Sequence, residues 1–209
     1  IRWVHPERGI VMPADFIPVA EETGLILQLG EWVLRQAIDD LAGWPEQMTV
    51  SINLSPVQMR SPTLISTMVN AIAANGVDPA RICLEITETV LMQESEANVA
   101  TLHRLRDLGV QIALDDFGTG YSSLNYLRSF PFSKIKIDRC FVAEIDSRED
   151  CRAIVRSVVS LAQSLGMTTC AEGIERQEQV DMLRAEGCGE VQGYLYSKEI
   201  GRASCRERV

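Results

Sequence analysis

Short β-rich runs alternate along this chain with longer stretches of helical periodicity, and this alternation constrains the fold more than any other feature. Helical stretches are expected at 16–44 (two helices), 63–75, 94–108, 122–129, 152–165 and 177–185. Strands separated by helices pair in parallel, because a hairpin cannot join them. The sequence therefore predicts an α/β fold. Its strands are expected to end near Trp3, Leu54, Thr87, Asp116, Asp138, Glu172 and Tyr194.

The helical stretches carry the signals expected at their faces and ends. Segment 152–165 has one apolar face, and a glycine follows each of four helices, where a C-terminal cap belongs. The face consists of Ile154, Val155, Val158, Val159, Ala162 and Leu165, and the cap glycines are Gly76, Gly109, Gly166 and Gly187.

The order of side chains within each strand distinguishes a closed barrel from an open sheet. In segment 50–54, Val50, Ile52 and Leu54 alternate with Ser51 and Asn53, and segments 83–86, 112–115 and 135–137 show the same alternation. An open sheet covered by helices on both sides would need two aliphatic faces. A barrel needs aliphatic residues only on the face that meets its outer helices. We therefore predict a helix-covered barrel.

Polar residues stand where these strands end, and barrel active sites lie at that rim. Their carboxylate and amide oxygens suit Mg²⁺ or Mn²⁺ better than Zn²⁺. The adjacent Asp115 and Asp116 suit a bridged pair of ions for phosphodiester cleavage, and Lys136 could position or deprotonate the attacking water. The candidate rim residues are Asn53, Glu85, Asp115, Asp116, Lys136, Glu172 and Gln192.

Simpler interpretations exist for each residue. A lone acid at a strand end usually caps the next helix, but five strand ends with matching chemistry make capping a poor explanation for all of them. Glu88 and Glu175 could support the metal ligands or be ordinary exposed carboxylates. His5 and His103 lack metal-ligand spacing, so we expect surface or packing roles for both.

Glycines after Asp116 in DDFGTGYSS do not complete a GxGxxG phosphate loop. We therefore expect a flexible loop there, leading to a helix capped by Ser122 or Ser123.

Composition excludes some functions. The net charge of −9 argues against binding nucleic acid through a basic face. No apolar run reaches membrane-spanning length, and the six cysteines show no CxxC pair or disulfide framework. We expect a reduced, cytoplasmic protein, with Cys83 and Cys170 serving as small buried residues.

Eight motifs together resemble the EAL-domain phosphodiesterases over residues 1–198. In order they are IRWVHPERG, FIPVAEETGLI, VSINLSP, LEITET, LDDFGTGYSSL, KIKID, AEGIE and VQGYLYS. The resemblance implies a modified TIM (β/α)8 barrel that often dimerises. It also implies hydrolysis of cyclic di-GMP to linear pGpG with two divalent metal ions, Mg²⁺ or Mn²⁺.

The resemblance also implies site roles. Lys136 and Gln192 would act on the catalytic water, Arg2 on a substrate phosphate, and Glu88 would anchor the loop after Asp116 that links dimer contacts to metal binding. Asn53, Glu85, Asp115, Asp116 and Glu172 would bind metal, Glu172 counting as catalytic too.

The ends of the chain depart from the family pattern. The family's first metal-binding Glu would lie two positions before Ile1, and the first strand further upstream. Residues 199–209 (EIGRASCRERV) resemble a translated sequencing adapter and are expected to be non-native, in place of the last helix. We expect the chain as written to be inactive. In its parent protein we expect an upstream sensory or diguanylate-cyclase domain, and a membrane tether is compatible with such a parent.

A second interpretation is a degenerate EAL domain that binds cyclic di-GMP without cleaving it. Loss of a metal carboxylate or of the loop sequence would favour this receptor, but the visible catalytic positions are retained.

Overall fold

The computed structural model describes residues 1–88, 96–118, 127 and 130–197, which form two units. The first unit comprises 1–113 with 124–131, and the second comprises 114–123 with 132–209. The predicted helix 122–129, the loop residue Gly120, the caps Ser122 and Ser123, and the tail 199–209 lie wholly or largely outside the described residues. Each unit is described by itself.

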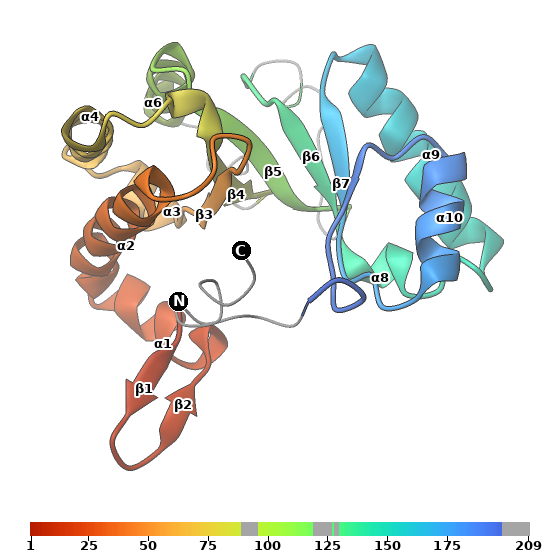
Figure 1. Ribbon diagram of the computed structural model, residues 1–209, viewed down its shortest axis with the longest axis horizontal. Coiled ribbons are helices and arrows are strands. Elements are labelled where there is room, and N and C mark those ends of the chain that lie inside the picture. Colours follow the sequence, from red (N-terminus) through yellow and green to blue (C-terminus); the bar gives the residue numbers. More distant parts are fainter. Residues whose placement is uncertain (89–95, 119–126, 128–129, 198–209) are drawn as a thin grey trace. The chain divides into compact units, whose positions relative to one another are not determined.

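The first unit begins with a hairpin and continues with helices that cover parallel strands (Figure 1). Helix α2 packs against α1, α4 and β3. Strand β3 pairs in parallel with β4, so that Val50 lies opposite Ile82 and Asn53 opposite Glu85. Its elements are β1 (Trp3–His5), β2 (Gly9–Val11), α1 (Pro13–Glu22), α2 (Leu25–Ala42), β3 (Val50–Asn53), α3 (Pro56–Met59), α4 (Leu64–Asn75), a 3₁₀ turn (Pro79–Arg81), β4 (Ile82–Thr87), α6 (Glu96–Asp107) and the start of β5 (Gln111–Phe117).

The second unit is a parallel sheet with two long helices. Strand order is β5-β6-β7-β8 here and β3-β4-β5 in the first unit, and α9 packs on β6 and β7. Strand β6 is therefore central, as Ile135 and Ile137 beside Lys136 predicted. Its elements are the end of β5, β6 (Lys134–Ile137), α8 (Arg139–Val142), α9 (Glu149–Ser164), β7 (Thr168–Ala171), α10 (Gln177–Ala185) and β8 (Glu190–Val191).

The predicted helix ends and buried cysteines are confirmed. Gly76, Gly109, Gly166 and Gly187 all have positive φ, between 62° and 93°, after the helices they were expected to end. Both Cys83 and Cys170 are buried free thiols. Among the described helices, none is both long and apolar enough to cross a membrane.

The N-terminal segment differs from the prediction of a strand ending near Trp3. Trp3 instead opens β1, which pairs antiparallel with β2. The turn explains this: the His5 ring nitrogen accepts hydrogen bonds from the backbone of Glu7 and Arg8, and Gly9 takes a φ of 70°. The segment therefore folds back on itself.

Two other boundaries differ. Strand β8 ends at Val191, so Tyr194 lies in the following turn. Helix α9 begins at Glu149, and Ile154 and Leu165 are more than one-third exposed. The buried stripe is instead Cys151, Val155, Val158, Val159 and Ala162, because this set keeps the spacing that one helix face requires.

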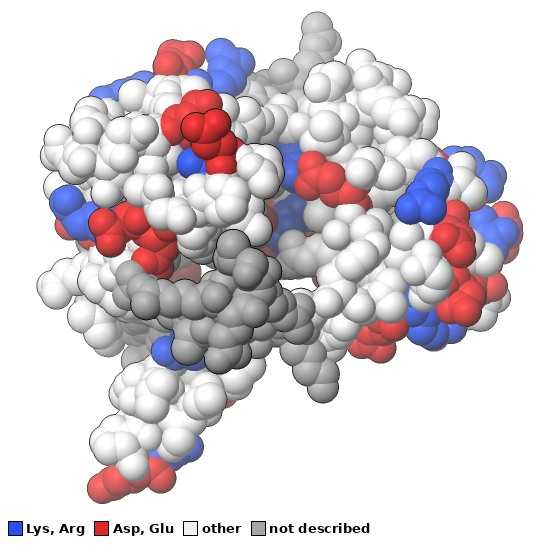
Figure 2. Space-filling view, in the orientation of Figure 1, with Lys and Arg blue, Asp and Glu red and all other residues white. Residues whose placement is uncertain are grey.

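The outer surface of the second unit carries charges of both signs. Figure 2 shows Lys and Arg side chains interleaved with Asp and Glu over the region of α9 and α10. Arg156 pairs with Glu186 at 2.7 Å, and Arg152 pairs with Glu149 at 3.6 Å. Exposed pairs of this kind contribute at most about 1 kcal/mol each, so this surface is ordinary solvated protein.

Gly30 of α2 is required by a contact with α3. A Cβ at this position would lie 1.8 Å from the side-chain nitrogen of Gln58. Gln58 is buried and forms a reciprocal capping box with Ser55, which fixes the direction of the chain after β3. We predict that Gly30→Ala lowers the melting temperature, since overpacking typically costs about 1–3 kcal/mol.

The matched control is Gly43→Ala at the end of the same helix. Gly43 has a φ of −87°, and an added Cβ would lie 3.6 Å from its nearest neighbour, so little change is expected. Thermal unfolding followed by circular dichroism makes the comparison. Equal melting temperatures would show that Gln58 moves aside freely.

Candidate metal and substrate site

Three carboxylates and one lysine meet at the ends of strands in the second unit. Ligand oxygens of Asp115, Asp116 and Glu172 all lie within 4.8 Å of one another. The ammonium of Lys136 lies 2.9 Å from Asp115 Oδ1 and 2.7 Å from Glu172 Oε1. Glu172 follows β7, and its backbone N–H extends the ladder by donating to Ile137 at 3.0 Å. Strand pairing thus brings the four side chains together.

The cluster is rich in carboxylates. Three of them and one ammonium share a place where Lys136 is only 4% exposed. Carboxylate oxygens at this spacing are the ligands that Mg²⁺ and Mn²⁺ prefer. The residues present therefore fit a divalent metal centre.

Asp116 is held in an unusual state. Its φ of 54° lies in the left-handed region, which aspartate tolerates better than most residues, and its N–H donates to the side chain of Asp115. Burial raises the pKa of Asp116, and the nearby carboxylates of Asp115 and Asp138 raise it further. Backbone strain and crowded charge are features that cluster at functional sites.

Asp138 belongs to this neighbourhood although the sequence analysis treated it only as a strand end. It follows β6, and its side chain accepts a 2.8 Å hydrogen bond from the Cys140 backbone at the start of α8. Burial alone would raise its pKa, but hydrogen bonds from Cys140 and Arg139 lower it on balance. The signal was present in KIKID: an acid at the C-terminal end of a predicted strand, as at the chosen positions.

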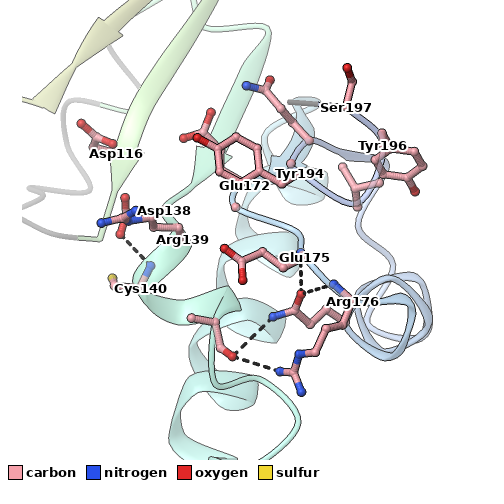
Figure 3. A pocket seen from close by; sticks show the side chains of 16 residues that line it. Asp116, Asp138, Arg139, Cys140, Glu172, Glu175, Arg176, Tyr194, Tyr196 and Ser197 are labelled. Atoms are coloured by element: carbon pink, nitrogen blue, oxygen red, sulfur yellow. Dashed lines mark hydrogen bonds between the residues drawn. The ribbon is translucent and has the colours of Figure 1, made fainter. Parts of the chain in front are cut away.

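A cavity of about 1410 Å³ opens beside the cluster (Figure 3). Asp116 and Glu172 line it, and so does Gln192, an exposed residue of the loop after β8. In Figure 3, Asp116 and Asp138 lie on one side of the view, and Tyr196 and Ser197 on the other. The cavity is lined by Asp116, Asp138, Arg139, Cys140, Ala143, Glu172, Gly173, Glu175, Arg176, Gln179, Val191, Gln192, Gly193, Tyr194, Tyr196 and Ser197.

Backbone hydrogen bonds join the loop after β7 to the loop after β8. Ile174 donates to Gln192 O at 3.1 Å and accepts from Leu195 N at 3.0 Å. A Cβ on Gly193 would lie 2.2 Å from both the N and the O of Ile174, so this approach requires glycine. The contact fixes Gln192 relative to the loop that carries Glu172.

The first unit contains the other predicted ligands. Asn53 and Glu85 are register partners at the ends of β3 and β4, and Glu85 is buried while Asn53 is exposed. Glu88 is buried, so it is not an ordinary exposed carboxylate, whereas Glu175 of the second unit is exposed at the cavity. Arg2 is half-buried, and its guanidinium donates to the carbonyl of Ile1. Convergence of Asn53 and Glu85 with the cluster stays a prediction.

Comparison with known proteins places the chain in a family. Residues 1–199 match the model of the EAL domain, and the chain therefore belongs to the EAL domain family. It is 39% identical over 204 residues to the bifunctional diguanylate cyclase/cyclic di-GMP phosphodiesterase MucR of Pseudomonas aeruginosa, covering 96% of this chain and 30% of that protein.

Two other curated relatives are similar over nearly the same span. Protein y4lL of Sinorhizobium fredii is 55% identical over 195 residues, covering 93% of this chain and 24% of that protein. The cyclic di-GMP phosphodiesterase PA2567 of Pseudomonas aeruginosa is 39% identical over 203 residues, covering 96% of this chain and 35% of that protein. The chain thus spans about a quarter to a third of these relatives.

Solved structures agree with the predicted fold. A MucR phosphodiesterase structure in complex with cyclic di-GMP matches with a TM-score of 0.92 and 38% identity, covering 98% of this chain and 84% of that one. A manganese and cyclic di-GMP complex of Klebsiella pneumoniae BlrP1 matches with a TM-score of 0.73 and 32% identity, covering 82% and 43%. The prediction of an α/β, TIM-barrel-like EAL fold is confirmed.

The crowded Asp116 carboxyl links stability to pH. Because its pKa is raised on folding, it favours the folded state only at low pH, and that contribution is lost as pH rises through the folded pKa. We predict that Asp116→Asn raises the melting temperature of the metal-free protein at pH 7, with a smaller gain near pH 4. Asparagine also tolerates the left-handed backbone.

Thermal unfolding in EDTA across this pH range tests the prediction, with the exposed Asp181→Asn on α10 as control. Added Mn²⁺ should then raise the melting temperature of the wild type more than it raises that of Asp116→Asn. A variant that melts below the wild type at pH 7 without metal would contradict the proposed crowding.

Proposed function

We propose that this chain is the catalytic part of a metal-dependent phosphodiesterase that hydrolyses cyclic di-GMP to linear pGpG. The observation that carries the proposal is the buried Lys136 held between Asp115 and Glu172, beside Asp116 and a large cavity. Membership of the EAL family and the names of relatives such as PA2567 support cyclic di-GMP as the substrate.

The metal ligands follow from the chemistry of the cluster. Asp115, Asp116 and Glu172 would hold Mg²⁺ or Mn²⁺, and Asn53 and Glu85 of the first unit would complete the set. Two bound ions would activate a water and stabilise the attacking and leaving oxygens of the phosphodiester. Three carboxylates whose ligand oxygens lie within 4.8 Å of one another support the binding of cations.

The remaining residues act on water and substrate. Asp115 and Glu172 fix the position of the Lys136 ammonium, and this ammonium would orient the attacking water. Gln192 at the cavity would hydrogen-bond the same water, and Arg2 would bind a phosphate. Glu88, buried just after β4, would anchor the loop that follows Asp116, and Glu175 would support the substrate side of the cavity.

The proposal extends to the parent protein. A cytoplasmic location and a homodimer remain proposals, as does an upstream sensory or cyclase domain. The last is supported by the bifunctional name of MucR and by the small share of the relatives that this chain spans. Sedimentation of the full-length protein tests the dimer.

The proposed activity is tested on the full-length protein that contains this chain. We expect cyclic di-GMP to be converted to pGpG in Mg²⁺ or Mn²⁺, with activity lost in EDTA and restored by added metal. Chromatography of the nucleotides measures the conversion. If the protein binds cyclic di-GMP but hydrolyses it under none of these metal conditions, the proposed enzyme is wrong and the protein is a cyclic di-GMP receptor.

Lys136 provides the sharper test. We predict that Lys136→Ala in the same protein lowers kcat by about 10²–10⁴-fold, the usual contribution of a positioned proton-transfer group. Substrate affinity should change much less, because the lysine acts on water. Turnover and cyclic di-GMP binding are measured separately.

Lys134→Ala is the matched control, since Lys134 lies on the same strand but pairs with Glu190 instead. Its turnover should stay close to that of the wild type. If Lys136→Ala keeps full turnover, Lys136 has no place in the mechanism.

A further inference from the structure

Gln179 joins the two loops that carry the carboxylates following β6 and β7. It lies in the first turn of α10 and is only 2% exposed. Its side-chain oxygen accepts from Glu175 N at 2.9 Å and from Arg176 N at 3.0 Å. Its nitrogen donates to Val142 O at 3.2 Å, with Ala143 O at 3.4 Å. Dashed lines in Figure 3 mark the bonds that Gln179 makes with Glu175, Arg176 and Ala143.

The surroundings define the orientation of this amide. Two N–H donors face one end and two carbonyl acceptors face the other, so the reverse orientation would set like against like. One buried amide therefore bonds both to the N–H groups of Glu175 and Arg176, just before α10, and to two carbonyls at the end of α8. These carbonyls also accept from Ile145 N and from the Arg176 guanidinium.

Capping of α10 alone does not explain why residue 179 carries an amide rather than a carboxylate. A glutamate at the same position would accept from both N–H groups, and its charge would favour a helix N-terminus. The amide nitrogen reaches across to the end of α8, where the guanidinium of Arg176 also donates to Ala143 O at 3.3 Å. A carboxylate in place of the amide would face two carbonyl oxygens. Glutamine thus serves the link between the loops rather than the helix.

A second contact brings the same two loops together. A Cβ on Gly173 would lie 2.5 Å from the Cβ of Arg139, so the loop after β7 lies against the start of α8. Glu172 precedes Gly173, and Asp138 precedes Arg139. The distance between these loops therefore sets where Glu172 and Asp138 lie relative to the cavity.

We propose that Gln179 is a positioning residue for metal binding: it sets the spacing of the loops after β6 and β7, and thereby the place of Glu172, the member of the carboxylate cluster that one of these loops carries. The proposal rests on the proposed function, and it concerns a residue that touches neither metal nor reacting atoms. Residues that orient metal ligands typically contribute about 10–100-fold to metal affinity or activity.

Gln179→Glu tests the proposal because it keeps the cap of α10 and removes the donor to α8. Gln177→Glu is the control: it adds the same charge to the same helical turn at an exposed site. In the full-length protein we expect Gln179→Glu to weaken Mn²⁺ binding and to lower kcat, each by about 10–100-fold. Its melting temperature without metal should lie below that of Gln177→Glu, because the buried carboxylate faces two carbonyl oxygens, so Mn²⁺ binding is compared at a temperature at which both variants are folded.

Calorimetry with Mn²⁺ alone gives a readout that does not depend on catalysis. A wild type that binds Mn²⁺ without hydrolysing cyclic di-GMP would overturn the proposed function, while the affinity comparison would still test Gln179. A Gln179→Glu variant with the Mn²⁺ affinity of the control would overturn the positioning role.

If Gln179→Glu does not fold, Gln179→Met, which lacks the charge, takes its place with the same expectation. If neither variant folds, Gln179 is a folding residue and the proposal fails.

Discussion

The buried ammonium of Lys136 is the interaction on which the site of the second unit depends. It offsets part of the repulsion between Asp115 and Glu172, which reach it from two different strands. Removing one partner of a buried ion pair typically costs about 3–5 kcal/mol, because the other charge stays buried and unpaired. The lysine thus allows carboxylates to gather at strand ends before any cation binds. The parallel pairing of β6 with β7 fixes the position of Glu172 relative to Lys136.

The same arrangement shows how this fold places strain at its site. Three acids share this place with one lysine, and Asp116 combines a left-handed backbone with a raised pKa. The surrounding structure is conventional: aliphatic strand residues, capped helices and a buried stripe on α9. The framework can hold a site that lowers stability, because the helices and strands around it form where their own sequences favour them.

The sequence predicted the framework and most of the cluster, because both follow from local rules. Strand parity and the position of acids after strands located Asp115, Asp116 and Glu172. Those rules do not reach contacts between segments far apart in the chain. Gln179 bonds to Val142 across 37 residues, and α8, with four residues, is too short to show a period. The hairpin of β1 and β2 was missed because its turn depends on hydrogen bonds to one histidine ring.

The contact between Gly193 and Ile174 divides the cavity wall into parts that differ in how freely they can evolve. Where the two loops meet, main chain lies against main chain, and any side chain at position 193 would force them apart. The neighbouring Tyr194 and Tyr196 project into solvent at the cavity edge, where they are more than half exposed. Natural variation can therefore change the surface that a ligand meets at these tyrosines while the frame beneath them stays constant. Preference among related ligands can then drift without disturbing the carboxylate cluster.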